Sequence, residues 1–179
     1  KRSDLLSTKN EVENDELLEF FQFVKSNPEQ HIKYRNENYH PSKLHKSIRD
    51  DDIDTFQTLL SQNNYTVNHK IGHSYYERTS TCDKNVSLIQ IAAVYGSLNV
   101  FKFLWMQNDI FLDQNLQFYA YSGRNFEIIH ICEEKCPFLN VVDFAISTHQ
   151  NDLVNYFLDN FEDKIESSEA LEKVEDDDN

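Results

Sequence analysis

The sequence predicts an all-α protein, built as a solenoid of about four helical hairpins with an N-terminal helical region and one hairpin or loop insertion. Three observations lead to this prediction. Apolar residues recur at helical spacing along most of the 179-residue chain. Glycine and proline occur only three times each, which leaves long segments free to be helical. A pattern of helix, tight turn and helix also recurs, as in repeat proteins.

The N-terminal region, residues 1–41, is predicted to hold two helices. The first would end before Pro28 and a short second one would follow, with Asn27 as its cap and Pro28 at its first helical position. We expect this region to cover one end of the repeat array, because solenoid ends need polar caps. One face of the first helix is apolar at positions i, i+3, i+4 and i+7: Leu17, Phe20, Phe21 and Val24.

The repeat array is predicted over residues 42–161, with repeats at 42–63, 87–107, 115–135 and 140–160. Aligning the repeats places small residues in one column of the first helix: Ser47, Ala92, Ala120 and Ala145. Good N-cap residues then begin each first helix: Ser42, Ser87, Asn115 and Asn140. The column that begins each second helix has good caps in all but the last repeat: Asp52, Ser97, Asn125 and Gln150.

Two segments fall outside the repeats. The insertion, residues 64–86, starts with an alternating pattern over residues 64–71 that predicts a hairpin strand, and continues as a loop. The segment at residues 162–179 holds nine acidic residues and two lysines, for a net charge of −7. Such a composition without aromatic residues is typical of a solvated acidic tail.

The second repeat resembles the ankyrin repeat. Residues 87–93 (SLIQIAA) stand where that family has TPLHxAA, and residues 96–104 (GSLNVFKFL) match its GHLEVVKLL. Leu44 and His45 keep the family's Leu-His, and Val67 and Asn68 stand where its hairpin carries Val-Asn. The resemblance covers residues 42–158. In its departures from the family pattern, the sequence is similar to the divergent, Asn-rich ankyrin proteins expanded in parasitic protists. Steps of 45, 28 and 25 residues depart from the usual period of about 33.

The resemblance implies a non-enzymatic module that binds another protein. It implies that His45 ties a helix to a neighbouring hairpin through a hydrogen bond. It also implies partner contacts at the ends of the first helices: Arg49, Val94, Tyr95, Ser122 and Thr148. Tyr75 and Tyr76 in the insertion are further candidates, since exposed aromatic residues are good interface anchors. The alternative is that these two tyrosines fold back onto the first repeat.

Charge and composition exclude several classes of function. The net charge of −14 argues against binding to nucleic acids and to anionic membrane surfaces. The longest apolar run is about five residues, whereas a membrane helix needs about twenty. Three cysteines without a secretory signal argue against a disulfide scaffold, so we expect an intracellular protein in the cytoplasm. Gly72, Gly96 and Gly123 lie too far apart for a nucleotide-binding loop, and we expect no cofactor.

A metal site is the strongest chemical alternative. His and Cys residues in the order His-x-Cys-x3-Cys-x12-His supply possible zinc ligands: His130, Cys132, Cys136 and His149. The repeat register instead places Cys132 in a core column and His130 in an outward column, so we expect no zinc. Asp50, Asp52 and Asp54 match the start of a calcium loop, but the glycine and glutamate that such a loop needs are missing. We therefore interpret them as a turn in which Asp52 caps a helix.

Catalysis has little support in the sequence. A thiol enzyme would need Cys82 beside His69 or His73, and no motif accompanies them. The sequence therefore predicts a protein-interaction adaptor or scaffold. The first alternative is a fixed structural component of a large protein assembly, with exposed apolar surface on several faces. A zinc or thiol enzyme is the more remote alternative.

Overall fold

The structure is a computed structural model of the whole chain. It describes residues 17–37, 41–72, 74–76, 85–113, 115–135 and 141–161. These residues are mostly helical, which confirms the prediction of a mainly α protein. The predicted acidic tail, residues 162–179, lies outside the described residues. The chain divides into two compact units, residues 1–42 with 74–80 and residues 43–73 with 81–179.

The first unit contains the predicted pair of N-terminal helices. Residues 17–26 are helical, and α2 spans Pro28–Glu37. Asn27 links the two, because its amide and side chain both donate to Phe23 O while its carbonyl accepts from His31 N. Phe20 and Val24 of the predicted apolar face are half-buried.

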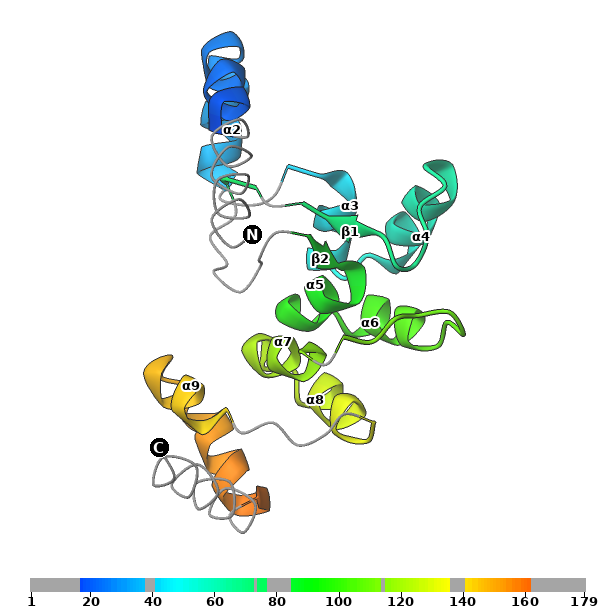
Figure 1. Cartoon of the computed structure of the whole chain (residues 1–179), viewed down its shortest axis with the longest axis vertical. Helices are drawn as coiled ribbons and strands as arrows, with labels where there is room; N and C mark the ends of the chain where they lie inside the picture. The colour runs from blue at the N-terminus through cyan, green and yellow to red at the C-terminus, as the bar shows by residue number, and fades with distance from the viewer. Residues whose placement is uncertain are drawn as a thin grey trace, which may run out of the picture. The chain divides into compact units, whose positions relative to one another are not determined.

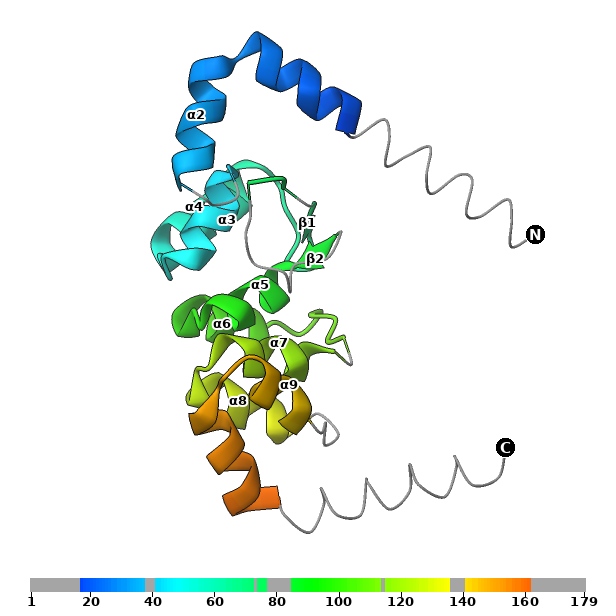
Figure 2. The ribbon, with the colours of Figure 1, turned by 90° about the vertical axis from the view of Figure 1, so that its left-hand side faces the viewer.

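In the second unit, the described helices follow one another in pairs (Figure 1). The first helix of each pair contacts the first helix of the next, from α3 to α5 to α7, and α4, α6 and α8 contact in the same way. Figure 2 shows the same succession from the side. The pairs are α3 (Lys43–Arg49) with α4 (Ile53–Gln62), α5 (Leu88–Tyr95) with α6 (Leu98–Trp105), α7 (Leu116–Gly123) with α8 (Phe126–Glu133), and α9 (Val142–Ser147) with residues 151–161.

The small residues of the first helices lie in the core, as the sequence predicts. Ser47, Ala92, Ala120 and Ala145 are all buried. Their small side chains let neighbouring first helices approach closely. Gly123 extends this close contact to the end of α7, where a Cβ atom would lie 1.9 Å from Ala93 O of α5.

The turn between the helices of each pair has the same backbone conformation throughout the described pairs. The residue two positions before the second helix begins is left-handed in every described pair, with φ of 52°, 66°, 58° and 55° at Asp51, Gly96, Arg124 and His149. Gly96 adopts this conformation without steric cost, and Asp51 and His149 belong to residue types enriched in it, whereas Arg124 does not. The repeating turn is therefore a feature of the fold that glycine spacing alone does not predict.

Three of the predicted caps are confirmed by their hydrogen bonds. Asp52 accepts from Thr55 N, and Asn125 accepts from the amides of Glu127 and Ile128. Ser87 and Gln90 form a capping box, in which each side chain binds the other residue's backbone amide. Such caps each stabilise a helix by about 1 kcal/mol.

Other predicted caps behave differently. Asn115 and Ser97 precede α7 and α6, but neither side chain makes a capping hydrogen bond. Val141 precedes α9, and the predicted cap Asn140 lies outside the described residues.

Side chains from the turns and loops tie successive pairs together. The Asp51 carboxylate accepts from Asn99 N and Val100 N at the start of α6, at 3.2 and 3.0 Å. Asn125 Nδ2 donates to Gly96 O at 2.9 Å. Asn68 of the insertion donates to Asp109 O and accepts from Phe111 N, which links it to the loop after α6.

The predicted hairpin strand is mostly wrong. Only β1 (Lys70–Ile71) is extended in a ladder, and it pairs with β2 (Val86–Ser87) in an antiparallel sheet with Ile71 opposite Val86. Residues 66–69 form a turn closed by His69 N and Thr66 O. From this turn, the Asn68 side chain binds a carbonyl and an amide of another loop.

Candidate functional site

The five predicted contact residues of the repeats define what we call the first-helix ends: Arg49, Val94, Tyr95, Ser122 and Thr148. Arg49 is the last residue of α3, Val94 and Tyr95 end α5, and Ser122 lies one residue before the end of α7. Because α3, α5 and α7 contact in succession, these residues lie at neighbouring helix termini. Thr148 directly follows α9.

The polar side chains among the first-helix ends form bonds to nearby residues of the same segment. The Arg49 guanidinium forms an ion pair with Asp50, with Nε and Oδ1 2.9 Å apart. Ser122 Oγ donates to Phe118 O, and Thr148 Oγ1 donates to Phe144 O. These local bonds reduce what the three side chains can offer to a partner.

The apolar first-helix ends are partly covered. Val94 and Tyr95 are both half-buried. The Tyr95 ring lies edge-on to buried His45, with 5.4 Å between ring centroids. The contact with His45 therefore covers part of the Tyr95 ring and fixes its orientation.

Tyr75 and Tyr76 pack against the N-terminal helices. Both tyrosines belong to the first unit. The Tyr75 ring lies 4.5 Å from the Phe20 ring, and Tyr75 is still exposed. His31 Nδ1 and the Tyr76 hydroxyl are hydrogen-bonded at 3.0 Å, and the Tyr76 ring meets Tyr34 edge-on. The insertion thus supplies aromatic residues to the N-terminal helices.

The possible zinc ligands differ in their exposure and in their contacts. Cys132 is fully buried in the core, as its repeat column predicts. His130 is exposed and contacts the Tyr156 hydroxyl and Glu133, and His149 is exposed in a turn. Cys136 lies outside the described residues. Within the described ranges, no three His, Cys, Asp or Glu residues are grouped as metal ligands.

The acidic run from Asp50 to Asp54 forms the turn that we expected. Both oxygens of Asp52 accept from Thr55, one from its amide and one from its hydroxyl. These bonds lower the pKa of Asp52, chiefly through the Thr55 hydroxyl, because they stabilise the ionised carboxylate. The thiol candidate cannot be placed, since Cys82 and His73 lie outside the described residues.

A polar network centred on Glu133 connects the last two pairs. The hydroxyls of Tyr121 and Tyr156 donate to the two carboxylate oxygens of Glu133, at 3.1 and 2.6 Å. Gln117 Nε2 donates to the Tyr121 hydroxyl. Burial, with the nearby carboxylate adding to it, raises the pKa of both tyrosines above the ordinary value of 10.0. The hydroxyls therefore remain protonated donors.

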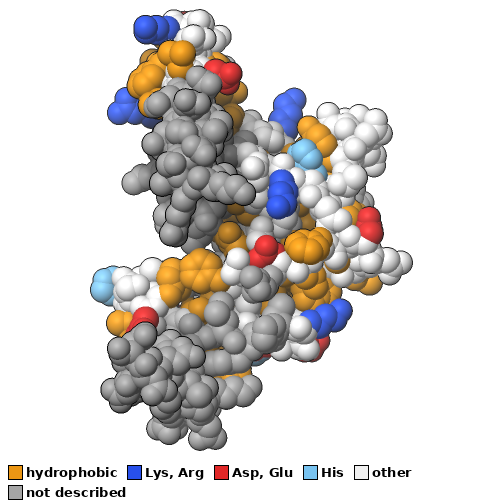
Figure 3. Space-filling view, viewed as in Figure 1, with side chains coloured by type: hydrophobic (Ala, Val, Ile, Leu, Met, Phe, Trp, Pro, Cys, Tyr) orange, Lys and Arg blue, Asp and Glu red, His pale blue; other side chains and the backbone are white. Residues whose placement is uncertain are grey.

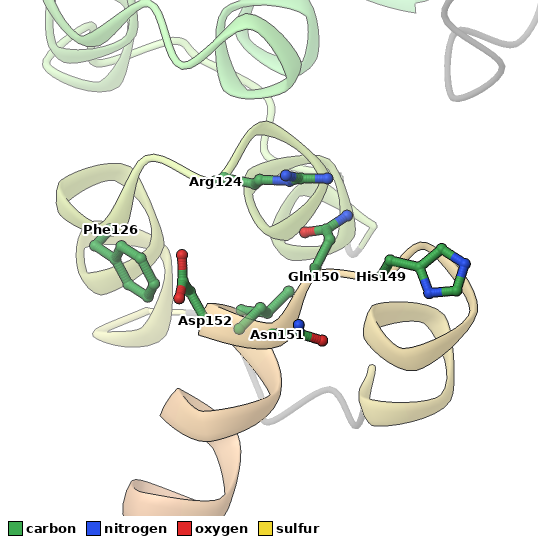
Figure 4. A pocket seen from close by; sticks show the side chains of 7 residues that line it. Arg124, Phe126, His149, Gln150, Asn151 and Asp152 are labelled. Carbon is green, nitrogen blue, oxygen red and sulfur yellow. The ribbon is translucent and has the colours of Figure 1, made fainter.

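A cavity of about 280 Å³ lies between the last two pairs (Figure 4). It is located where the turn of the third pair meets the start of the helix of residues 151–161. Figure 4 shows Arg124, Gln150 and Asp152 around this space, with His149 directed away from it. The lining consists of one α8 residue, the two turn residues Arg124 and His149, the cap position Gln150 and the first residues of the last helix: Phe126, Arg124, His149, Gln150, Asn151, Asp152 and Leu153.

Sequence reasoning did not identify this cavity. One signal was present, because Gln150 is the poor cap in a column of good ones. The cavity also depends on Arg124 occupying a left-handed turn position, which the sequence pattern does not reveal.

The comparisons with known proteins give a match to a family model. Residues 109–175 match a family model described as a domain of unknown function, DUF3447. The matched region includes α7, α8, α9 and the following helix, and it amounts to less than half of the chain. No curated protein and no solved structure matches the chain.

Proposed function

We propose that this protein is a non-enzymatic protein-interaction module, a scaffold or adaptor whose helical pairs form an ankyrin-like solenoid. The observation that carries the proposal is the succession of contacts from α3 to α5 to α7. Helical pairs stacked in this way bury a continuous core and present equivalent positions of each pair along one edge. Such an edge suits an extended polypeptide or a protein surface.

The ankyrin-like character is supported by details at the positions of the resemblance. Ser87 and Gln90 form a capping box at the start of the second repeat. Asn68, at the position of the family's Val-Asn, joins successive loops through two hydrogen bonds. His45 is buried beside the next pair, which suits a structural histidine.

No helix in the described part of the chain has the length and apolar character needed to cross a membrane. We propose that the partner is another protein. The first-helix ends are the proposed contact surface, with Tyr95 as its aromatic anchor. Tyr75 is a second, separate contact candidate on the first unit.

Crosslinking mass spectrometry in native cell lysate tests this proposal. We expect a partner to crosslink near the first-helix ends and to be lost when Tyr95→Ala and Val94→Asp are combined. Met106→Asp serves as the matched control, because Met106 is 79% exposed at the other end of a helix pair. Circular dichroism must show that both variants fold. Equal crosslinking of the two variants would contradict the proposed surface.

A fixed structural role in a large assembly is the second candidate, and one observation favours it. Large exposed hydrophobic side chains in the second unit occur on several elements, which the face in Figure 3 also shows. They include Met106, Phe111, Ile146 and Leu158. Crosslinks distributed over all these elements and unaffected by the Tyr95 variant would support this role.

A further inference from the structure

The junctions between successive pairs show how this fold provides hydrogen-bond acceptors for the backbone amides at the start of a second helix. At the first junction, the Asp51 carboxylate from the preceding turn accepts from Asn99 N and Val100 N. An acidic group therefore occupies the positive end of α6. The carboxylate comes from the neighbouring pair and not from the helix itself.

The second junction is closed by a carboxamide. Asn125 Oδ1 accepts from Glu127 N and Ile128 N, at 3.1 and 3.3 Å. Its Nδ2 atom donates to Gly96 O of the preceding turn. The carboxamide oxygen and nitrogen of Asn125 are therefore both hydrogen-bonded, and the side chain joins the preceding turn to the start of α8.

The third junction has neither group. Arg124 stands at the turn position that Asp51 holds in the first repeat, and Gln150 stands at the cap position of Asn125. Gln150 is only 6% exposed, yet its Oε1 atom has no hydrogen-bond partner. Buried polar atoms are normally paired, so this acceptor calls for a donor from elsewhere.

The cavity at this junction is lined by groups that are complementary to a carboxylate. Within the described residues, the Arg124 side chain has no ion-pair partner, and the amides of Asn151 and Asp152 have no acceptor. The guanidinium and the positive helix end both favour a carboxylate. Asp152 on the opposite side disfavours a doubly charged anion such as phosphate. Gln150 Oε1 needs an N–H donor close to the carboxylate.

We propose that this cavity binds the side-chain carboxylate of an aspartate or glutamate in a partner polypeptide. The carboxylate would lie between the Arg124 guanidinium and the amides of Asn151 and Asp152. A backbone N–H of the same peptide would donate to Gln150 Oε1. The ligand thus replaces the group that Asp51 supplies at the first junction. This inference rests on the protein-binding role proposed above and names one chemical feature of the partner.

Nuclear magnetic resonance on the full chain tests the site with a minimal probe, N-acetyl-aspartate N-methylamide. We expect saturable shifts of the Asn151 and Asp152 amides and the Arg124 side-chain Nε–H, with a dissociation constant on the order of 1–10 mM. N-acetyl-asparagine N-methylamide lacks the charge and should bind at least about tenfold more weakly, because charge-assisted hydrogen bonds are stronger.

Variants separate the roles of the lining residues. Arg124→Gln should weaken binding of the aspartate probe about tenfold or more, whereas Arg35→Gln, at an exposed position of α2, should leave it unchanged. Gln150→Leu keeps the side-chain bulk and removes the acceptor, so it should also weaken binding. Amide spectra that match the unaltered protein away from the cavity show that each variant is folded.

Three outcomes would overturn the inference. One is the absence of shifts from the aspartate probe, and another is equal binding of the asparagine probe. The third is a shift caused by inorganic phosphate alone, which would assign the cavity to a different anion. None of these results depends on the first-helix ends, so the crosslinking experiment can still support or contradict protein binding by itself.

Discussion

At the scale of single residues, Gly123 determines how closely α7 approaches α5. Replacing glycine by alanine inside an exposed helix normally stabilises it by about 1 kcal/mol. Here the added Cβ would lie 1.9 Å from Ala93 O and 2.9 Å from Val94 O. These are backbone atoms, so the two helices would have to separate. We expect Gly123→Ala to lower the free energy of unfolding by about 1–3 kcal/mol in urea denaturation.

Gly72 provides the matched control, because a Cβ at that position meets no atom within 4 Å. Gly72→Ala should change the free energy of unfolding by no more than about 0.5 kcal/mol. Equal destabilisation by the two substitutions would show that the α5–α7 contact is looser than the structure indicates.

The capping role of position 150 can be tested by measuring the free energy of unfolding. Asparagine at this position could cap the helix of residues 151–161 in the way that Asn125 caps α8. We expect Gln150→Asn to raise the free energy of unfolding by about 0.5–1 kcal/mol and to weaken binding of the aspartate probe. The reference variant is Asn125→Ala, which should lower the free energy of unfolding by about 1 kcal/mol. A destabilising Gln150→Asn would mean that the third junction does not follow the other two.

At the scale of elements, helix positions could be predicted and turn conformations could not. Periodic apolar residues and small core residues such as Ala92 and Ala120 depend on local spacing, and the structure buries them as expected. The left-handed turns at Asp51, Arg124 and His149 depend on how each pair must join its neighbour, and only a small fraction of non-glycine residues adopt this conformation.

The contacts of the insertion were also beyond sequence reasoning. Tyr76 meets His31, which is 45 residues away along the chain, and no periodic pattern relates the two. The cavity near Arg124 is a similar case, since it results from the absence of a bond that the other junctions make. Residue spacing reveals which side chains repeat, but it does not reveal which contact is missing.

The Glu133 network makes the junction of α7, α8 and the last helix sensitive to alkaline pH. The folded protein holds the pKa of Tyr121 and Tyr156 above the ordinary value of 10.0. Above about pH 10, the unfolded chain releases protons that the folded chain retains, so stability falls as pH rises. Below that pH the contribution is fully present.

Tyr121→Phe tests this element. The substitution leaves Glu133 Oε1 and Gln117 Nε2 without their partner, so we expect a loss of about 1–2 kcal/mol at pH 7. The stability of the variant should then fall less steeply between pH 9 and 11 than that of the unaltered protein. Chemical denaturation at several pH values measures both effects. An unchanged alkaline slope would show that Tyr121 titrates alike in the folded and unfolded chains.

At the scale of the whole molecule, the succession of pair contacts predicts stepwise stability. In a solenoid each repeat contacts only its neighbours, so an end repeat can be removed without unfolding the rest. The fourth pair contributes Leu153 and Phe157 to the core, and Phe157 packs against Tyr121. Burial of each such side chain is worth about 1.5–3 kcal/mol.

Deleting residues 141–179 should therefore weaken α7 and α8 while α5 and α6 remain folded. Amide hydrogen exchange should stay slow for buried helix residues such as Ile91 and Leu104, and become faster for Ile129 and Cys132. Deleting residues 115–135 instead removes the middle of the array and should destabilise both neighbouring pairs. If the end deletion made exchange uniformly fast in every helix, the pairs would form a single cooperative core, and the solenoid proposal would lose its main physical support.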